Sequence, residues 1–366
     1  MDVLSDVLRV VRLSGAVFFT AEFTSPWAVQ SPSSDSLAAM VLPEAECVAI
    51  FHVLVEGDCW VECRDCPPVR MESGDVIIFP HGDQHEMGSH RGAKAVPIAS
   101  LLPRGQFQDL PRFSHGGGGN ISRFICGYLH CDQRFNPLIG ALPTMLLVHS
   151  RDGYVAVEAG AGDGKRLPNV APAVESWLAS TLRYTINEAR SSRPGNVTML
   201  GRLTELMFVE ILRQYMEQLP EGQTGWLAGL NDPQVDKTLR LMHEDPARSW
   251  TMEELARSAA ISRSALAQRF TDLIGSSPMH YLAGWRIQLA RQMLRDGTHS
   301  IPDVAARVGY ESEAAFNRAF KRFVGTPPGA WRRACQPDLK RPRIELQRRE
   351  RRRTRQLRQH GREKTA

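Results

Sequence analysis

Histidine, carboxylate and cysteine side chains in the first half of this 366-residue chain have types and spacing that suit a chemical site. Glu46, His52 and His85 flank apolar segments. Together they could hold a divalent metal ion, because imidazole and carboxylate are both common metal ligands. The alternative is a pocket in which two hydrogen-bonded histidines meet a small molecule without a metal. We predict this second arrangement, with His52 and His85 as ligand-binding residues, no metal and no cofactor.

Cys63 and Cys66 form a Cys-x-x-Cys pair, with Cys59 close by in the sequence. This spacing is typical of half a zinc site or of a redox pair. The sequence has no second such pair, although Cys126 and Cys131 could approach it in the fold. Seven cysteines are too few for a disulfide scaffold in a chain of this length, and no secretory signal is evident. We therefore expect reduced cysteines in the cytoplasm, with a thiol-based sensor as the alternative.

A different chemistry is indicated in the second half of the chain, where two segments repeat one template. Residues 249–282 and 299–332 each predict a short amphipathic helix, a tight turn and a second helix. Ser262 and Ser312 should cap the second helices, which end at a glycine followed by proline. Equivalent alanines in the first helices allow the two helices of each segment to cross closely. This combination predicts two helix-turn-helix units.

The helical period of about 100° per residue predicts which side chains of the second helices face away from the core. Leu266 and Phe270 fall on one side of the first helix, and Phe316 and Phe320 on one side of the second. Gln268, on the opposite side, suits a bidentate contact with adenine in the major groove, and arginines beside that face suit phosphates. We predict DNA contacts by Arg263, Ser264, Ala267, Gln268 and Thr271, and by Glu313, Asn317, Arg318 and Lys321.

Residues 230–333 resemble the two-unit DNA-binding domain of the AraC/XylS family of transcription regulators. The stretches LARSAAISRSALAQRF, YLAGWRIQLARQML and IPDVAARVGYESEAAFNRAFKRFVGTPPGAWR carry this resemblance. One departure is Ala260 in the first turn, where the family often has glycine. The resemblance implies a protein that binds double-stranded DNA and contacts RNA polymerase. It also implies that the first recognition helix reads bases while the second mainly anchors phosphates.

Short apolar runs separated by turn residues occupy the front of the chain and predict a β-sandwich or a small barrel. Sixteen residues separate Gly57 from Gly74, and Pro80, Gly82 and His85 follow. This spacing resembles the two motifs of the cupin barrel, so the front half is similar to the cupin-type sensor domains that are often fused to AraC-type domains. The metal set of catalytic cupins is not intact, because glutamates and an isoleucine occupy its positions before Gly57.

We predict an α+β multidomain protein in four parts. These are a cupin-like β-barrel at 1–165, a helical linker at 166–229, an all-α domain with two helix-turn-helix units at 230–336, and a basic disordered tail at 337–366. The net charge of +5 divides into −7 for residues 1–230, +4 for 231–336 and +8 for 337–366. We therefore expect only residues 231–366 to bind a polyanion. The amphipathic linker helices either pack on each other or the barrel, or form a dimer seam.

These patterns predict a sequence-specific transcription regulator, without enzymatic activity, that is controlled by a small-molecule effector. A homodimer is an expected assembly. The alternatives are a cupin-type metalloenzyme, a thiol or metal sensor fused to a DNA-binding domain, and a repair protein with a cysteine nucleophile. The incomplete ligand set and the lack of a recognisable nucleophile motif disfavour the enzymes. No apolar run approaches the ~18 residues that span a membrane, so no membrane partner is expected.

Overall fold

The computed structural model describes residues 2–11, 14–41, 47–64, 66–101, 111–131, 137–151, 154–159, 177–191, 193–220 and 222–335. The chain divides into two compact units, Met1–Glu244 with Thr251–Pro278, and Asp245–Trp250 with Met279–Ala366. The tail that we predict to be disordered, 337–366, lies outside the described residues.

Two sheets enclose one apolar core at the front of the chain, which confirms the predicted β-barrel. The seven-stranded sheet has the order β12-β11-β6-β3-β10-β1-β9, and the five-stranded sheet has the order β5-β4-β7-β2-β8. The core between them includes Phe23, Phe79 and Phe124. The strands are β1 (Ser14–Thr24), β2 (Ala28–Ser31), β3 (Cys47–Glu56), β4 (Asp58–Cys63), β5 (Val69–Glu72), β6 (Val76–Phe79), β7 (His85–Gly88), β8 (Val96–Pro97), β9 (Arg112–Gly116), β10 (Ile121–Cys131), β11 (Leu146–Arg151) and β12 (Tyr154–Ala159).

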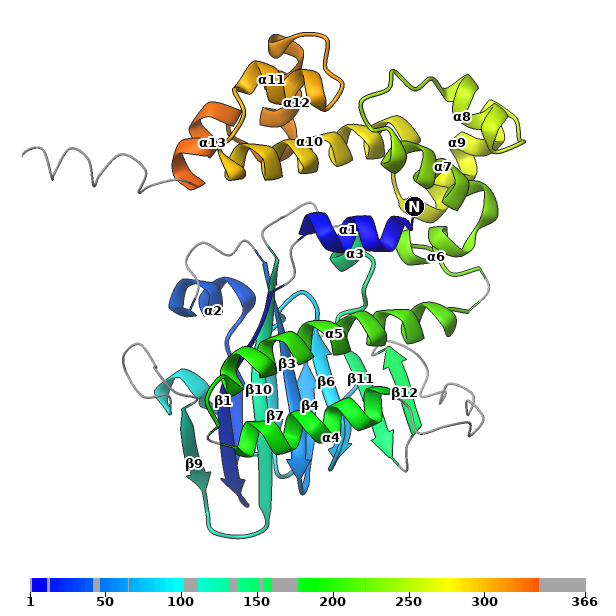
Figure 1. Ribbon diagram of the computed structural model, residues 1–366. Helices are drawn as coiled ribbons and strands as arrows, with labels where there is room; N and C mark the ends of the chain where they lie inside the picture. Colours follow the sequence, from blue (N-terminus) through cyan, green and yellow to red (C-terminus); the bar gives the residue numbers. More distant parts are fainter. Residues whose placement is uncertain are drawn as a thin grey trace, which may run out of the picture. The chain divides into compact units, whose positions relative to one another are not determined.

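The described residues after β12 are helical, as the sequence predicts, and a few short helices lie between or before the strands in the N-terminal part (Figure 1). Among the described residues, no helix is long and apolar enough to cross a membrane. The helices are α1 (Val3–Val11), α2 (Ser34–Val41), α3 (Pro137–Gly140), α4 (Trp177–Arg190), α5 (Asn196–Glu217), α6 (Trp226–Asn231), α7 (Pro233–Glu244), α8 (Met252–Ser258), α9 (Arg263–Ile274), α10 (Pro278–Asp296), α11 (Ile301–Arg307), α12 (Glu313–Val324) and α13 (Pro328–Cys335).

Helices α4 and α5 pack on each other and cover part of the outer side of the seven-stranded sheet (Figure 1). The contact is closest where Gly201 of α5 meets Gly15 of β1. A Cβ built on Gly201 would lie 2.7 Å from the carbonyl oxygen of Gly15, so no larger residue fits without a shift. The amide of Gly15 also donates a hydrogen bond to Glu205 at 3.1 Å. The predicted packing of the linker helices on the barrel is thus present, while the dimer seam stays a prediction.

Gly201→Ala should destabilise the protein by ~1–3 kcal/mol, because the added methyl group pushes α5 away from β1. Urea unfolding followed by circular dichroism measures the change. Gly329→Ala in α13 is the control, since its built Cβ would meet only side-chain atoms, of Ile301 at 3.4 Å and of Arg333 at 3.7 Å. That variant should be neutral or gain up to ~1 kcal/mol from helix propensity. Equal stabilities for the two variants would contradict the close packing of α5 on β1.

Candidate nucleic-acid interface and ligand pocket

The two helix-turn-helix units, α8–α9 and α11–α12, begin with the same local hydrogen bonds. Thr251 and Glu254 form a reciprocal capping box at the start of α8, and an equivalent box starts α11. The recognition helices α9 and α12 follow Ser262 and Ser312, whose hydroxyls each accept a backbone amide hydrogen bond at 3.2 Å. These bonds satisfy amide donors that lack partners within the helix. The predicted serine caps are therefore confirmed.

The turn inside each unit needs a left-handed backbone. Gly309, in the second unit, has a φ of 84°, and a Cβ there would lie 2.4 Å from the carbonyl oxygen of Ala247. Ala260 takes the same role in the first unit with a φ of 58°, a conformation that is unfavourable by roughly 1–2 kcal/mol for a residue with a Cβ. The departure from glycine noted in the sequence thus preserves the turn but strains it.

Arg286 of α10 fastens the second turn to the segment that precedes α8. Its guanidinium donates to the carbonyl oxygens of Pro246 at 2.6 Å, Arg248 at 2.8 Å and Gly309 at 3.2 Å. One side chain therefore satisfies three backbone acceptors. Arg286 could not be predicted from the sequence, because its partners lie 23 to 40 residues away and follow no helical period.

The predicted DNA-contact residues of α9 are on its solvent side. Leu266 and Phe270 are fully buried on the opposite side. The exposed residues are Arg263, Ser264, Gln268 and Thr271, and Ala267 is half-buried. The helix is therefore rotated as the sequence analysis expects, and its contact with DNA stays a prediction.

Gln268 stands at the edge of a broad groove of about 850 Å³ that runs beside α9. Its amide nitrogen donates to Asp272 at 2.7 Å within the same helix. A bidentate contact with a base would require the amide to leave this partner. Asp272 was not predicted as a partner of Gln268, although the i, i+4 spacing of a glutamine and an aspartate on a helix is a recognisable signal.

Two arginines of α9 are held by carboxylates within the same unit. Arg263 forms an ion pair with Glu253 of α8, and both side chains are more than half exposed. Such an exposed pair contributes only ~0–1 kcal/mol, so a DNA phosphate can replace the carboxylate at little cost. Arg269, by contrast, meets a nearly buried carboxylate, with its Nε atom 2.7 Å from Asp232. This second pair ties α9 to the junction of α6 and α7.

The outward side of α12 is more basic than that of α9. Phe316 and Phe320 are fully buried. The predicted contact residues opposite them are Glu313, Arg318 and Lys321, which are exposed, and Asn317, which is half-buried. Within the part of the chain that the structure describes, neither Arg318 nor Lys321 has an ion-pair partner. Both cations are therefore free to meet phosphates.

His52 and His85 lie together inside the barrel. Their Nε2 atoms are 2.8 Å apart, His52 Nδ1 is 2.9 Å from the Cys126 sulfur, and His85 Nδ1 is 2.8 Å from the carbonyl oxygen of Asp83. A carbonyl only accepts, so His85 Nδ1 carries the proton in the neutral ring and His85 Nε2 accepts. His52 Nε2 must then donate, and its Nδ1 accepts the Cys126 thiol. One set of tautomers therefore satisfies every hydrogen bond in the series from Asp83 through His85 and His52 to Cys126.

Burial keeps the hydrogen-bonded side chains of His85, His52 and Cys126 uncharged at neutral pH. It lowers the pKa of His85 to about 4, and it also lowers the pKa of His52. Burial raises the pKa of the Cys126 thiol, which therefore stays protonated. The contact of Cys126 with His52 was not predicted from the sequence, because the two are 74 residues apart and meet only through the pairing of β3 with β10.

A narrow cavity of about 30 Å³ adjoins His52 and Cys126, and most of its walls are apolar. His85 lies one hydrogen bond behind this cavity and does not line it. Glu46, the third predicted candidate ligand for a metal, lies outside the described residues. Among the residues that are described, no group of three or more histidines, cysteines or acids could hold a metal ion. Cys63 and Cys66 are not joined by a disulfide bond.

Both halves of the chain match known families. A family model described as Cupin matches residues 2–161 and 165–217, and one described as Helix-turn-helix domain matches residues 255–334. A putative AraC-like transcription regulator of Streptomyces lividans is 46% identical over 91% of this chain and 98% of its own length. Another, of Streptomyces antibioticus, is 42% identical over 92% of this chain and 100% of its own. The HTH-type transcriptional regulator AlkR of Acinetobacter baylyi is 26% identical over 91% and 99%.

The neutral histidines predict a loss of stability in acid. In the unfolded chain a histidine takes up its proton near pH 6.5, whereas folded His85 resists protonation until about pH 4. Stability is therefore complete above pH 6.5 and falls as the pH drops through this window. For His85 alone the loss by pH 4 is on the order of 3 kcal/mol. Urea unfolding at a series of pH values measures it.

His85→Phe should make this dependence shallower, because phenylalanine keeps the stacking on Phe79 and cannot take up a proton. His90→Gln, at an exposed position, is the matched control and should retain the full dependence. A wild-type protein equally stable at pH 7 and pH 4.5 would show that the pair is not held neutral.

Proposed function

The chain belongs to the AraC-like family of transcription regulators with an N-terminal cupin domain, and we propose that it recognises specific double-stranded DNA sequences through α9 and α12. The observation that carries this proposal is the pair of matched helix-turn-helix units. Each buries an apolar stripe and leaves a polar side of its second helix exposed. A helix with such a side fits the major groove, where base edges can be read.

The two recognition helices have different tasks in this proposal. On α9, Ser264, Ala267, Gln268 and Thr271 face the bases, and Arg263 exchanges Glu253 for a phosphate. On α12, Arg318 and Lys321 anchor phosphates, because they are exposed cations without a competing carboxylate among the described residues. Glu313 and Asn317 lie on the same DNA-facing side of α12. This division supports specificity from the first unit and affinity mainly from the second.

The barrel acts as a sensor and not as an enzyme in this proposal. Each histidine is occupied by a neighbour within the barrel, and the Cys126 thiol is kept protonated and so is a poor nucleophile. The apolar cavity beside His52 supports a small apolar effector. Its small volume requires the barrel to open for entry. Binding would then favour one conformation of the barrel.

We further propose a homodimer that uses the exposed side of the α4–α5 pair. Large apolar side chains there are unusually exposed, at 51% for Trp177 and 54% for Leu206. Tyr184 and Met199 are also exposed on the same two helices. Apolar groups of this size on adjacent helices support association with a second copy. The domain limits given above, contact with RNA polymerase and a cytoplasmic location belong to the same proposal, which membership of the family supports.

Gln268→Ala should weaken binding to the preferred duplex by ~1–3 kcal/mol and relax specificity at one base pair, because one base loses its amide partner. Arg318→Ala should weaken binding to all sequences about equally and reduce the slope of log affinity against log salt by about one. Fluorescence anisotropy of the full chain with a preferred duplex and its single-base variants measures both effects.

Gln30→Ala removes a half-buried glutamine from the barrel and is the control, with no expected effect on DNA affinity. A Gln268→Ala protein with an unchanged sequence profile would mean that this side of α9 does not read bases. An Arg318→Ala protein with an unchanged salt slope would remove Arg318 from the phosphate contacts.

Compounds that bind the barrel cavity should raise the melting temperature of the full chain by mass action. A thermal screen of small apolar compounds, beginning with indole and toluene, identifies them. His52→Phe should abolish the stabilisation by each hit, because it fills the cavity wall, while His90→Gln should retain it. Hits that stabilise His52→Phe as strongly as the wild type would place the effector elsewhere.

A further inference from the structure

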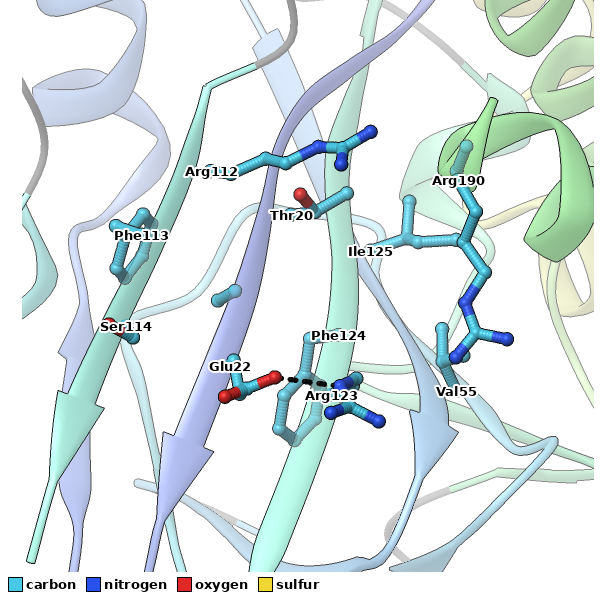
Figure 2. Close-up of a pocket in the computed structure, with 12 residues that line it drawn as sticks. Thr20, Glu22, Val55, Arg112, Phe113, Ser114, Arg123, Phe124, Ile125 and Arg190 are labelled. Carbon is cyan, nitrogen blue, oxygen red and sulfur yellow. Dashed lines mark hydrogen bonds and ion pairs between the residues drawn. The ribbon is translucent and has the colours of Figure 1, made fainter. Parts of the chain in front are cut away.

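A groove on the outer side of the seven-stranded sheet has the side chains of a binding site that the proposed function does not use. Its volume is about 410 Å³, within the range of small-molecule sites in proteins. Strands β9, β1 and β10 form its floor, and the last turn of α4 forms one wall (Figure 2). The cavity inside the barrel, at about 30 Å³, is far smaller.

Strand register brings the polar groups of the groove into rows. Arg112 of β9 lies opposite Thr20 of β1, and Ser114 lies opposite Glu22. Glu22 in turn lies opposite Arg123 of β10. Because side chains alternate along a strand, these residues all point to the outer side while their neighbours fill the core.

The charges of the groove do not balance. Arg123 is already engaged by two carboxylates, Glu22 at 2.8 Å and Glu56. Arg112 and Arg190 are both exposed, and among the described residues neither has an ion-pair partner. Figure 2 shows Arg112 extending across β1 near Thr20, and Arg190 extending from α4 toward Val55. When Glu56 is counted, which pairs with Arg123 but does not line the groove, three guanidinium groups and two carboxylates leave one positive charge in excess.

Apolar side chains line the space around these arginines. Ile125 of β10 and Val55 of β3 contribute to the floor, and Ala189 contributes to the wall formed by α4. The hydroxyl groups of Thr20 and Ser114 add hydrogen-bonding partners at the edge. The groove therefore combines a cationic end with a compact apolar surface.

We propose that this groove binds a small carboxylic acid, as its monoanion, with a compact apolar body. The planar guanidinium groups of Arg112 and Arg190 match the two oxygens of a carboxylate. One excess positive charge matches one negative charge, whereas a phosphate near its dianionic state would leave the groove net negative. The apolar floor removes the body of the acid from water.

The position of this site gives it a structural consequence. Arg112 belongs to the sheet and Arg190 is the last residue of α4. A carboxylate held by both arginines would tie the α4–α5 pair to the sheet. Binding would then stabilise the docked helices by mass action. This site is separate from the barrel cavity, and its ligand does not depend on the DNA-binding proposal.

Benzoate is the probe, and isothermal titration of the full chain measures its binding. The wild type should bind benzoate at millimolar concentration or below. The double variant Arg112→Gln/Arg190→Gln should bind about tenfold or more weakly, since both charged donors are lost. Arg183→Gln, which removes a charge from the same helix outside the groove, should bind as the wild type does. Benzamide, the neutral isostere, should bind about tenfold or more weakly than benzoate.

Absence of benzoate binding to the wild type at millimolar concentration would overturn the proposal. Equal binding by the double variant, or equal binding of benzamide, would do the same. Inorganic phosphate that binds as tightly as benzoate would overturn the assignment to a monocarboxylate. The double variant alters two exposed side chains, so its melting temperature without benzoate should match that of the wild type, and this comparison separates a lost site from a lost fold.

Discussion

Burial of one apolar stripe on each recognition helix determines which side chains remain to face a partner. Leu266 and Phe270 on α9, and Phe316 and Phe320 on α12, have no exposed surface. Each such side chain contributes roughly 1.5–3 kcal/mol by leaving water, which exceeds the contribution of an exposed ion pair on the same helix. The rotation of both helices follows from these contacts. The polar sides of α9 and α12 are a consequence of that rotation.

Sequence signals that act within one helical turn, such as caps and helix stops, are sufficient to predict much of the C-terminal half. The cap at Ser262 and the stop at Gly275 predict α9 with the limits that the structure has, and the same holds for α12. Contacts between distant residues could not be predicted in this way. Asp232 holds Arg269 across 37 residues, and Cys126 meets His52 across 74. No local period links such partners, because only the tertiary fold brings them together.

In the barrel, too, the local sequence pattern predicts the histidine pair but not the charged groove on the outer side. The glycine and histidine spacing predicts that His52 and His85 approach each other, and they do. The charged groove was not predicted, because it depends on the register of β9 and β10 against β1, which the alternating pattern of one strand does not determine. Strand β10 serves both sites, with Cys126 facing the core and Ile125 lining the groove. Its alternation separates a neutral apolar interior from a cationic outer side.

The central claim is that this protein reads DNA sequence through two helix-turn-helix units. Repeated selection of duplexes from a random pool by the full chain, at fixed salt, tests it most directly. The account predicts enrichment of one sequence motif, and loss of its best-defined bases when the selection is repeated with Gln268→Ala. Recovery of a pool without any sequence preference, from a folded protein, would contradict the account.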